Sequence, residues 1–350
     1  MISKYQPLLQ FGIQYALKYA LRSLQPRTYM KATVEAHPIQ GLIKYHGLLD
    51  FAKRIPFHDS ISVCVEAMKT TTTVEVSRDF AEDEIIVNGI RLGGNEKGRV
   101  LTVLNELRQV AQVKDKMKVV SDNSVKQGKG LGFSASGFAA LGVAASRALE
   151  ISLDHVTLSE IVRLGAGSAT RSLAGGYALW YANRSGRSYA EQIAPPDALD
   201  LGMVIVPVLS GVKTDEAHDE VLGSPLFDLR LKRIGELIET MKRAIYLRDV
   251  AAVARLAEED TLNLHATTMT GKYHMVLWEP ETVKVIKEVV AMRSEQVSAW
   301  YSMDTGPSVF INTYTHNLDQ VASRIRKAGF NNVLVSKVGG EPKIIDRHLF

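Results

Sequence analysis

A glycine- and serine-rich segment, residues 128–141, has the residue types and spacing of a phosphate-binding loop. Its sequence is GKGLGFSASGFAAL, and three glycines within five residues favour a loop over a strand or a helix. The alanine-rich stretch that follows predicts a helix. A glycine loop that opens a helix presents free backbone N–H groups and the positive end of the helix dipole, which together bind phosphate. Ser134 and Ser136 add hydroxyl groups at the start of this helix.

Two other phosphate-binding motifs do not fit this segment. The P-loop pattern is absent because no Lys-Ser or Lys-Thr pair follows the required glycine spacing. Gly130, Gly132 and Ala135 satisfy the loose dinucleotide-binding pattern, but that pattern needs an acidic residue at the end of a second strand. Here Glu150 only ends the same predicted helix. A simpler interpretation, a tight turn before a buried helix, therefore stays open for the segment taken alone.

Three charged residues are candidates for chemistry. Asp304, in Ser-Met-Asp-Thr-Gly-Pro, ends a predicted strand, where a carboxylate either forms an Asx turn or acts on a hydroxyl that attacks a phosphate. Arg171 lies among serine, alanine and glycine, and is either an exposed helix arginine or a bidentate ligand of a carboxylate. Lys44 interrupts an apolar, strand-like run. It therefore faces either solvent or a site.

The histidines and the single cysteine do not predict a transition-metal site. His37, His46 and His58 lack metal-ligand spacing within one element, and Cys64 is alone. If a nucleotide binds, its phosphate oxygens and a few protein groups are expected to hold Mg²⁺. One cysteine also rules out internal disulfides and fits a reducing, cytoplasmic setting.

Composition is that of an ordinary globular enzyme, since 46% of the 350 residues are hydrophobic and 23% are charged. The net charge of +4 is small for this length and points to no nucleic-acid partner. No apolar run of about 18 residues is present, so no segment is expected to span a membrane.

Residues 1–29 differ from the rest of the chain because they are basic and amphipathic. No acidic residue precedes Glu35, and apolar residues recur at steps of three and four between Ile13 and Leu24. The segment is either a targeting or membrane-surface helix, an appended helix that packs on the main body, or an upstream extension before a second start at Met30.

From residue 31 the pattern predicts short strands mixed with helices. Strands rich in Val, Ile and Thr are expected at residues 31–36, 61–66, 71–76, 118–121 and from 177. Asn88-Gly89, after residues 85–87, predicts a hairpin turn. Apolar residues at helical spacing from Val100 to Val110 predict a helix over residues 99–113. Further helices are expected at residues 158–165 and 168–174.

Pro195-Pro196 marks a boundary between two lobes. Beyond it, helices are expected at residues 226–247, 250–262, 281–293 and 318–328. Strands are expected at residues 203–209, 300–302, 308–313 and 332–337, the last of the chain. Strands and helices that do not alternate strictly indicate an α+β fold, and a cleft between the lobes is the natural place for a ligand.

Several segments together resemble the GHMP kinase superfamily, and most closely its diphosphomevalonate decarboxylases. The loop at residues 130–141 is similar to the superfamily's nucleotide loop. Residues 43–47, Ile-Lys-Tyr-His-Gly, resemble the family segment Ile-Lys-Tyr-Trp-Gly, and residues 169–176 resemble its Ala-Cys-Arg-Ser-Leu-x-Gly-Gly. Further motifs of the family are matched by residues 56–62, 70–73, 260–266 and 304–307. Each match is weak alone, but the joint match from about residue 31 into the C-terminal lobe is specific.

Departures from the family pattern bear on the substrate. The second lysine of the Lys-Tyr segment is Leu48 here, and its tryptophan is His46. Loss of a cation that neutralises phosphate favours a substrate with less negative charge, and residues 37–47 most resemble phosphomevalonate decarboxylases. Residues 211–218 replace the serine-rich substrate loop of the diphosphate enzymes, and Lys126 replaces the usual proline before the nucleotide loop.

The resemblance implies a two-lobed GHMP-kinase fold. Residues 30–200 would form an N-terminal, ribosomal-protein-like α/β lobe, and residues 201–350 a C-terminal, ferredoxin-like lobe, with residues 1–29 as an extension. It also implies ATP- and Mg²⁺-dependent decarboxylation of (R)-5-phosphomevalonate, through transient 3-phosphorylation, to isopentenyl phosphate, ADP, phosphate and CO₂. Relatives are commonly homodimers, so a cytoplasmic homodimer is expected.

The same resemblance assigns roles to the candidate residues. Asp304 would align or deprotonate the 3-hydroxyl, Lys44 would keep Asp304 ionised, and Arg171 would hold the carboxylate. The substrate pocket is expected to include Tyr45, His46, Ser60 and Lys213. ATP is expected to bind Gly130, Leu131, Gly132, Phe133, Ser134, Ala135, Ser136 and Gly137, with Ser134 and Ser136 also near Mg²⁺.

Three alternatives stay open. A diphosphomevalonate or 3,5-bisphosphomevalonate decarboxylase would share the same catalytic residues. A small-molecule kinase of the superfamily would phosphorylate its substrate without decarboxylation. A non-catalytic protein would use the basic N-terminal helix to bind a membrane or nucleic acid, and its binding would depend on salt and not on Asp304.

Overall fold

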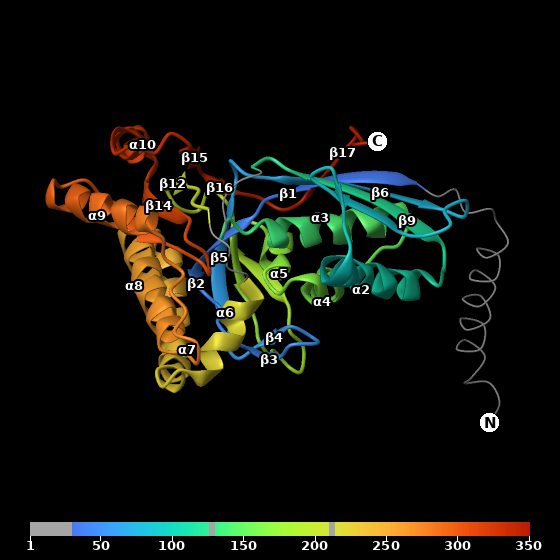
Figure 1. Ribbon diagram of the computed structural model, residues 1–350, viewed down its shortest axis with the longest axis horizontal. Helices are drawn as coiled ribbons and strands as arrows, with labels where there is room; N and C mark the ends of the chain where they lie inside the picture. Colours follow the sequence, from blue (N-terminus) through green and yellow to red (C-terminus); the bar gives the residue numbers. More distant parts are fainter. Residues whose placement is uncertain (1–29, 126–129, 210–213) are drawn as a thin grey trace, which may run out of the picture.

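The computed structural model describes residues 30–125, 130–209 and 214–350, which form an α+β fold in two lobes (Figure 1). The predicted N-terminal extension, residues 1–29, lies outside these described residues, as do Lys126 and Lys213. None of the helices in the described ranges has the length and apolar character needed to cross a membrane.

A six-stranded sheet forms one layer of the N-terminal lobe, and helices form the other (Figure 1). The strand order is β17-β1-β6-β9-β7-β8, and the pairs are antiparallel except for β7 with β9. The strands are β1 (Lys31–Ala36), β6 (Thr70–Ser77), β7 (Glu84–Val87), β8 (Ile90–Arg91), β9 (Lys116–Asn123) and β17 (Lys343–Ile345). The helices are α2 (Gly94–Ala111), α3 (Phe133–Ala148), α4 (His155–Gly165) and α5 (Ala169–Ala174).

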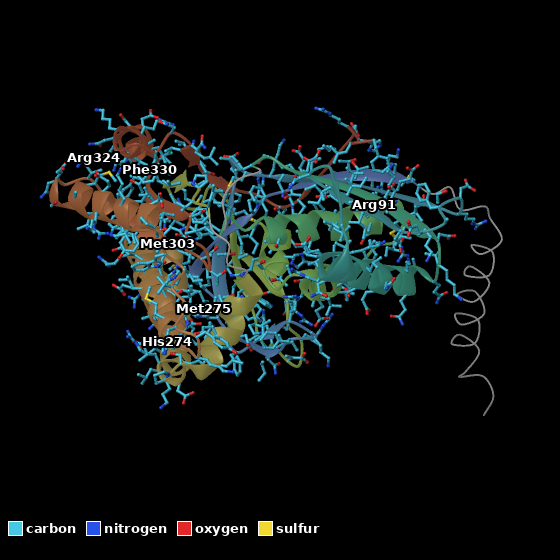
Figure 2. All side chains as sticks on the ribbon, in the orientation of Figure 1. Arg91, His274, Met275, Met303, Arg324 and Phe330 are labelled. Atoms are coloured by element: carbon cyan, nitrogen blue, oxygen red, sulfur yellow. The ribbon has the colours of Figure 1, made fainter. Side chains whose placement is uncertain are left out.

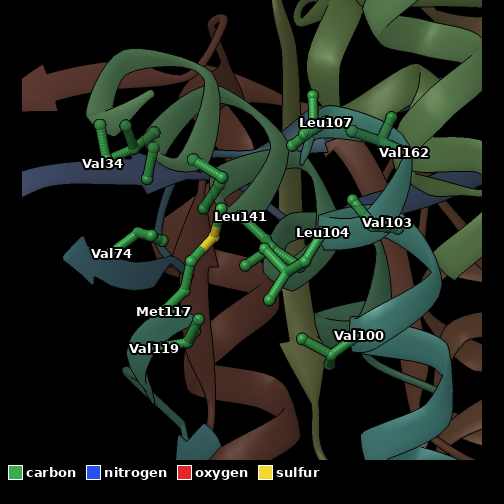
Figure 3. Packing of buried hydrophobic residues seen from close by; sticks show 14 of the residues in the cluster. Val34, Val74, Val100, Val103, Leu104, Leu107, Met117, Val119, Leu141 and Val162 are labelled. Atoms are coloured by element: carbon green, nitrogen blue, oxygen red, sulfur yellow. The ribbon is translucent and has the colours of Figure 1, made fainter. Parts of the chain in front are cut away.

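Alternating side chains of this sheet form the core beneath α2 and α3 (Figure 3). Val74 on β6 and Met117 on β9 are fully buried, because the two-residue period of a strand sends every second side chain to the same face. Leu104 and Leu107 of α2 meet them at helical spacing. The expected apolar face of this helix ends earlier than predicted, since Val110 is 46% exposed.

A second sheet lies between the two lobes (Figure 1). Its strands are β2 (Ile39–Ile43), β5 (Ser60–Val65), β10 (Tyr177–Trp180), β11 (Ala190–Ala194) and β16 (Val338–Gly339). Every residue of β5 is buried, because helices of both lobes pack near it. The helices on the C-terminal side are α7 (Phe227–Tyr246) and α8 (Val250–Met269).

A four-stranded sheet and two further helices complete the C-terminal lobe. The strand order is β13-β14-β12-β15, with β12 (Leu201–Val206), β13 (Ala299–Ser302), β14 (Val309–Tyr314) and β15 (Leu334–Ser336). The helices are α9 (Pro280–Ser294) and α10 (Leu318–Lys327). The shorter elements are β3 (Leu48–Asp50), β4 (Ile55–Pro56), α6 (Thr214–Glu220), η1 (Val221–Gly223) and η2 (Thr315–Asn317).

The end of the chain returns to the N-terminal lobe, so the expectation that residues 332–337 are the last strand is wrong. Val338 of β16 pairs with Val65, and Ile345 of β17 pairs with Thr33. These strands are two and three residues long, and their partners lie far away in sequence, so no local pattern marks them. The division into residues 30–200 and 201–350 stays a prediction. The returning strands β16 and β17 pair with the sheets formed by residues of the first range.

Leu104→Ala is expected to lower the free energy of unfolding by about 2–5 kcal/mol, because it leaves a cavity in the core under the six-stranded sheet. Leu104 is fully buried, whereas Val110 on the same helix is 46% exposed. Val110→Ala is therefore the matched control and should change stability by no more than about 0.5 kcal/mol. Urea unfolding of both variants tests this, and equal losses would contradict the assignment of the core.

Candidate active site

The glycine loop lies directly against the turn that carries Asp304. Gly130 has φ +75°, and a Cβ on it would lie 2.7 Å from the Cα of Gly306. Gly132 has φ +73°, and a Cβ there would lie 2.6 Å from the carbonyl oxygen of Ile39. Glycine is thus required at both positions by the backbone angle and by the space. These two close approaches hold the loop between β2, which carries Ile39, and the turn after β13, which carries Gly306.

Helix α3 starts at this loop without a cap. Gly132 is the N-cap residue, no side chain caps the helix, and its first turn has no acidic residue. The positive end of the dipole is therefore open to an anion. Ser134 is exposed beside it, but Ser136 is fully buried, and its hydroxyl lies 2.7 Å from the Thr70 hydroxyl. Ser134 is accordingly the better placed of the two serines for a phosphate or Mg²⁺.

A cavity of about 230 Å³ lies next to the start of α3. Its walls are mainly apolar, and a few polar groups such as Asn123 and Ser121 interrupt them. Phe133, Ser134 and Gly137 belong both to the predicted nucleotide loop and to this cavity. An apolar slot beside an anion site suits a flat base joined to phosphates. Sequence reasoning missed this cavity because its walls come from β6, β7, β9, α2 and α3 together.

Asp304 follows the end of β13, where Figure 2 shows the preceding residue, Met303, beside α8. Met303 N donates to the Thr261 hydroxyl on α8, at 3.2 Å. One Asp304 carboxylate oxygen accepts a hydrogen bond from Gly41 N at 3.0 Å. Burial raises the pKa of Asp304, and the positive charges of Lys44 and Arg171 oppose that rise.

Lys44 faces the site and not solvent, since only 3% of it is exposed. Its ammonium donates to Ala257 O at 2.7 Å, to the Thr261 hydroxyl at 2.7 Å and to the Ser302 hydroxyl at 2.9 Å. Burial lowers the pKa of Lys44 to about 8, although Asp260 and Asp304 oppose this. Because these three bonds use all its hydrogens, Lys44 acts on Asp304 through its charge.

A fully buried ion pair fixes the backbone of Lys44. Arg230 on α7 donates to Asp260 on α8 at 2.8 Å, and neither side chain is exposed to solvent. Asp260 also accepts from Lys44 N at 2.8 Å, and Arg230 donates to Lys44 O at 2.7 Å. Burial alone would raise the pKa of Asp260, but Arg230 and Lys44 hold it below its usual range.

Sequence reasoning missed Arg230, although a signal was present. Phe227, Ile234, Ile238 and Met241 are buried at helical spacing on α7, and Arg230 occupies the next position of that same face. A charged residue within an apolar stripe indicates a buried partner. The partner, Asp260, belongs to a motif that the resemblance did cover, but no role was assigned to it.

Arg171 lies on α5, is 2% exposed, and is not the exposed helix arginine of the alternative interpretation. Its guanidinium lies over the rings of Tyr45 at 5.4 Å and Trp180 at 5.5 Å. Burial lowers its pKa to about 10, with Tyr45 and Asp304 opposing, so it remains charged near neutral pH. Asp304 acts on it electrostatically, but its Nε has no hydrogen-bond partner among the described residues. A buried cation that lacks a hydrogen-bond acceptor on one of its nitrogens is suited to an anionic ligand.

Among the other described candidates for the substrate pocket, Tyr45 lies against Arg171. Tyr45 stacks on His218 at 4.4 Å between ring centroids, and His46 meets His218 edge to face at 5.8 Å. Ser60 is fully buried, and its hydroxyl has no partner among the described residues. His218, on α6, was not predicted, because its place beside Tyr45 depends on packing between distant segments.

The arrangement can position a phosphate donor, a hydroxyl and a carboxylate together. The start of α3 is suited to phosphates, Asp304 to a hydroxyl, and Arg171 to a carboxylate. The described residues include no group of three or more His, Cys, Asp or Glu side chains able to hold a metal ion. Mg²⁺ that accompanies a nucleotide takes ligands from its phosphate oxygens, and the exposed Ser134 at the start of α3 is the candidate protein ligand.

Two family models match most of the chain. One is described as the diphosphomevalonate decarboxylase-like N-terminal domain and matches residues 36–190. The other is described as the mevalonate 5-diphosphate decarboxylase C-terminal domain and matches residues 213–345. A phosphomevalonate decarboxylase of Haloferax volcanii is 38% identical to this chain over 91% of its length and 98% of the relative's.

Solved structures share the fold. The mevalonate diphosphate decarboxylase from Enterococcus faecalis is similar with a TM-score of 0.84 and 27% identity, over 91% of this chain and 99% of that one. A second structure has the same TM-score of 0.84, 27% identity and coverage of 91% and 99%, and is described as a complex with MVAPP, AMPPCP and magnesium.

Arg230→Met is expected to destabilise the protein by about 3–5 kcal/mol, because it leaves Asp260 as an uncompensated buried charge. The matched control is Lys242→Met on the same helix, where Lys242 pairs with Glu239 at the surface. That variant should lose no more than about 1 kcal/mol. Urea unfolding at neutral pH measures both, and a loss for Arg230→Met as small as that of the control would contradict the importance of the buried pair.

Proposed function

Because the chain belongs to the diphosphomevalonate decarboxylase family of the GHMP kinase superfamily, we propose that it catalyses the ATP-dependent decarboxylation of (R)-5-phosphomevalonate. The products are isopentenyl phosphate, ADP, phosphate and CO₂. The observation that carries this reaction is Arg171, a buried cation that acts electrostatically on Asp304 and whose Nε has no hydrogen-bond partner among the described residues. A decarboxylase needs such a cation for the substrate's carboxylate, beside the group that acts on its hydroxyl.

Leu48 supports the choice of a monophosphate as substrate. It is 3% exposed and stands where the resemblance places a lysine that neutralises phosphate in diphosphate-using relatives. A substrate with one phosphate carries less negative charge and needs fewer cations. The identity of 38% to the phosphomevalonate decarboxylase of Haloferax volcanii supports the same choice.

The residues of this chain then divide the work. Arg171 binds the C1 carboxylate, and Asp304 aligns the 3-hydroxyl and accepts its proton. ATP, held with Mg²⁺ at the start of α3, would supply the phosphoryl group that makes this tertiary hydroxyl a leaving group, and Mg²⁺ would neutralise phosphate charge. As the C3–O bond breaks, electrons of the C1–C2 bond form the C2–C3 double bond, and CO₂ leaves. Once Asp304 has passed that proton to the phosphoryl group now on the oxygen, its restored negative charge stabilises the positive charge that develops at C3.

The nucleotide is proposed to bind along the start of α3. The uncapped first turn and Ser134 would hold its phosphates, and the neighbouring cavity of about 230 Å³ would hold its base. The related structure with AMPPCP, an ATP analogue, and magnesium supports ATP and Mg²⁺ as the bound species.

We also propose that the protein acts in the cytoplasm as a homodimer. The single cysteine, Cys64, is buried and free, which fits a reducing compartment. The homodimer is proposed from the resemblance to the family. Size-exclusion chromatography with light scattering would measure it directly.

Turnover of the three phosphorylated mevalonates, side by side, tests the substrate. We expect kcat/KM to be at least tenfold higher for (R)-5-phosphomevalonate than for the 5-diphosphate, a difference of about 1.4 kcal/mol in transition-state binding. The 3,5-bisphosphate is the intermediate of the proposed reaction and is expected to release CO₂ without ATP. Leu48→Lys should reduce the difference in kcat/KM between the monophosphate and the diphosphate, because it restores a cation that can neutralise phosphate. A clear preference of the unmodified protein for the diphosphate would overturn the assignment.

Asp304→Asn is expected to lower the rate of CO₂ release by about 10³ or more, because it removes the main catalytic carboxylate. Asp319→Asn, at an exposed position on α10, is the control and should retain full activity. With substrate that carries a radioactive label in its carboxylate, the released labelled CO₂ measures decarboxylation directly. If the unmodified protein forms phosphorylated product without CO₂, it is a kinase, and activity retained in Asp304→Asn would contradict the proposed role of this residue.

A further inference from the structure

Three buried histidines influence one another near Tyr45, since His218 contacts Tyr45 and His46, and His58 acts electrostatically on His46. His46 follows β2, His58 lies between β4 and β5, and His218 is on α6, with exposures of 0%, 6% and 1%. The rings of His46 and His218 meet edge to face at 5.8 Å. Tyr45 stacks on His218 at 4.4 Å and lies 5.4 Å from the guanidinium of Arg171. The ring of Tyr45 therefore lies against both His218 and the proposed carboxylate-binding cation.

Hydrogen bonds define which nitrogen of His46 carries the hydrogen. His46 Nε2 lies 3.2 Å from the Thr268 hydroxyl, and that hydroxyl donates its own hydrogen to Leu264 O at 3.0 Å. His46 therefore donates from Nε2, and its Nδ1 is a lone pair. This Nδ1 is buried and has no partner among the described residues.

His58 also has one hydrogen-bonded nitrogen and one nitrogen without a partner, but here Nδ1 carries the hydrogen and Nε2 has the lone pair. Its Nδ1 lies 2.7 Å from the backbone carbonyl of Asp59, so the hydrogen is on Nδ1. Its Nε2 is buried without a partner within the described ranges. The cluster therefore holds two buried nitrogen lone pairs, on His46 and His58, that face no hydrogen-bond donor of the described protein.

Burial, together with nearby positive charge, keeps the rings of His46 and His58 neutral when no ligand is bound. Burial lowers the pKa of His46 well below its usual value, and it lowers that of His58 to about 4. The groups that act on His46 are His218, Arg230, His265 and His58. Those that act on His58 are Arg230, Asp260 and Arg171. Because Asp260 is already paired with Arg230, the surroundings favour an added anion and disfavour an added proton alone.

We propose that His46, His58 and His218 form the subsite for the 5-phosphate of the substrate, and that His46 Nδ1 and His58 Nε2 take up protons when it binds. This inference rests on the proposed function. A phosphate dianion needs hydrogen-bond donors, and protonation converts each lone pair into a charged donor. The cluster gains positive charge only when the phosphate binds, and at most one charge from each of the two histidines. This suits a monophosphate better than a more highly charged diphosphate.

The sign of the pH dependence follows from this coupling. Bound phosphate raises the pKa of both histidines above their values in the free protein, so binding is strong at lower pH. As the pH rises through the values of the bound state, the protons are lost and KM increases. The rate constant kcat should change less, because the histidines contact the phosphate and not the reacting carbon.

Isothermal titration calorimetry tests the proton uptake. The protein is titrated with (R)-5-phosphomevalonate at about pH 7.5, where a phosphate monoester is a dianion, in buffers with different ionisation enthalpies. We expect net proton uptake with this ligand and none with mevalonate, which lacks the phosphate. Absence of uptake in a protein that turns the substrate over, or equal uptake with both ligands, overturns the inference and leaves the proposed function standing.

Two substitutions remove the basic nitrogens that could take up protons but keep the observed hydrogen bonds. His46→Gln retains a donor for Thr268, and His58→Asn retains a donor for the Asp59 carbonyl. The double variant should lose the proton uptake and raise KM at least tenfold, with kcat changed less. His155→Gln is the control, since His155 lies at the start of α4 and, among the described residues, bonds the Ala190 carbonyl at 2.8 Å. If KM and proton uptake are unchanged in the double variant, the inference is overturned. If the unmodified protein turns over no phosphorylated mevalonate, the proposed function and the inference are overturned together.

Discussion

The buried ion pair between Arg230 and Asp260 sets the position of the groups around it. Neither side chain reaches water, so their hydrogen bonds are made inside the protein. Besides bonding to each other, both side chains hold the backbone of Lys44, because Asp260 accepts from its N–H and Arg230 donates to its carbonyl. This fixes the end of β2, and Gly41 on that strand donates to Asp304. A Cβ on Gly41 would lie 2.7 Å from the Asp304 carboxylate and 2.8 Å from Lys44 Cγ, so no larger residue fits between them.

Such a site is costly to form and is therefore better explained by chemistry than by stability. Buried charges contribute little net free energy to folding, and a hydrophobic replacement is often as stable. Burial lowers the pKa of Lys44 and Arg171 and raises that of Asp304. Groups whose pKa values shift in this way within one site are typical of active sites. The charge balance around Arg171 also leaves it suited to an anionic substrate.

The two ends of the proposed reaction come from different lobes. The start of α3 belongs to the N-terminal lobe, and the turn with Asp304 belongs to the C-terminal lobe. Gly130 and Gly306 bring them into contact, and the returning strands β16 and β17 tie the end of the chain to the N-terminal sheets. A fold that keeps the phosphate donor and the carboxylate base this close is suited to direct phosphoryl transfer.

The sequence by itself determined the features that depend on neighbouring residues. The Asn88-Gly89 hairpin is confirmed, with φ values of 51° and 80°, and the glycine loop opens α3 as predicted. Only the tertiary structure decided the partners of Lys44, the burial of Ser136, and the places of Arg230 and His218. The physical reason is that turns and helix starts follow from local backbone preferences. Burial and pairing depend on which distant segments meet, and a single sequence does not record that.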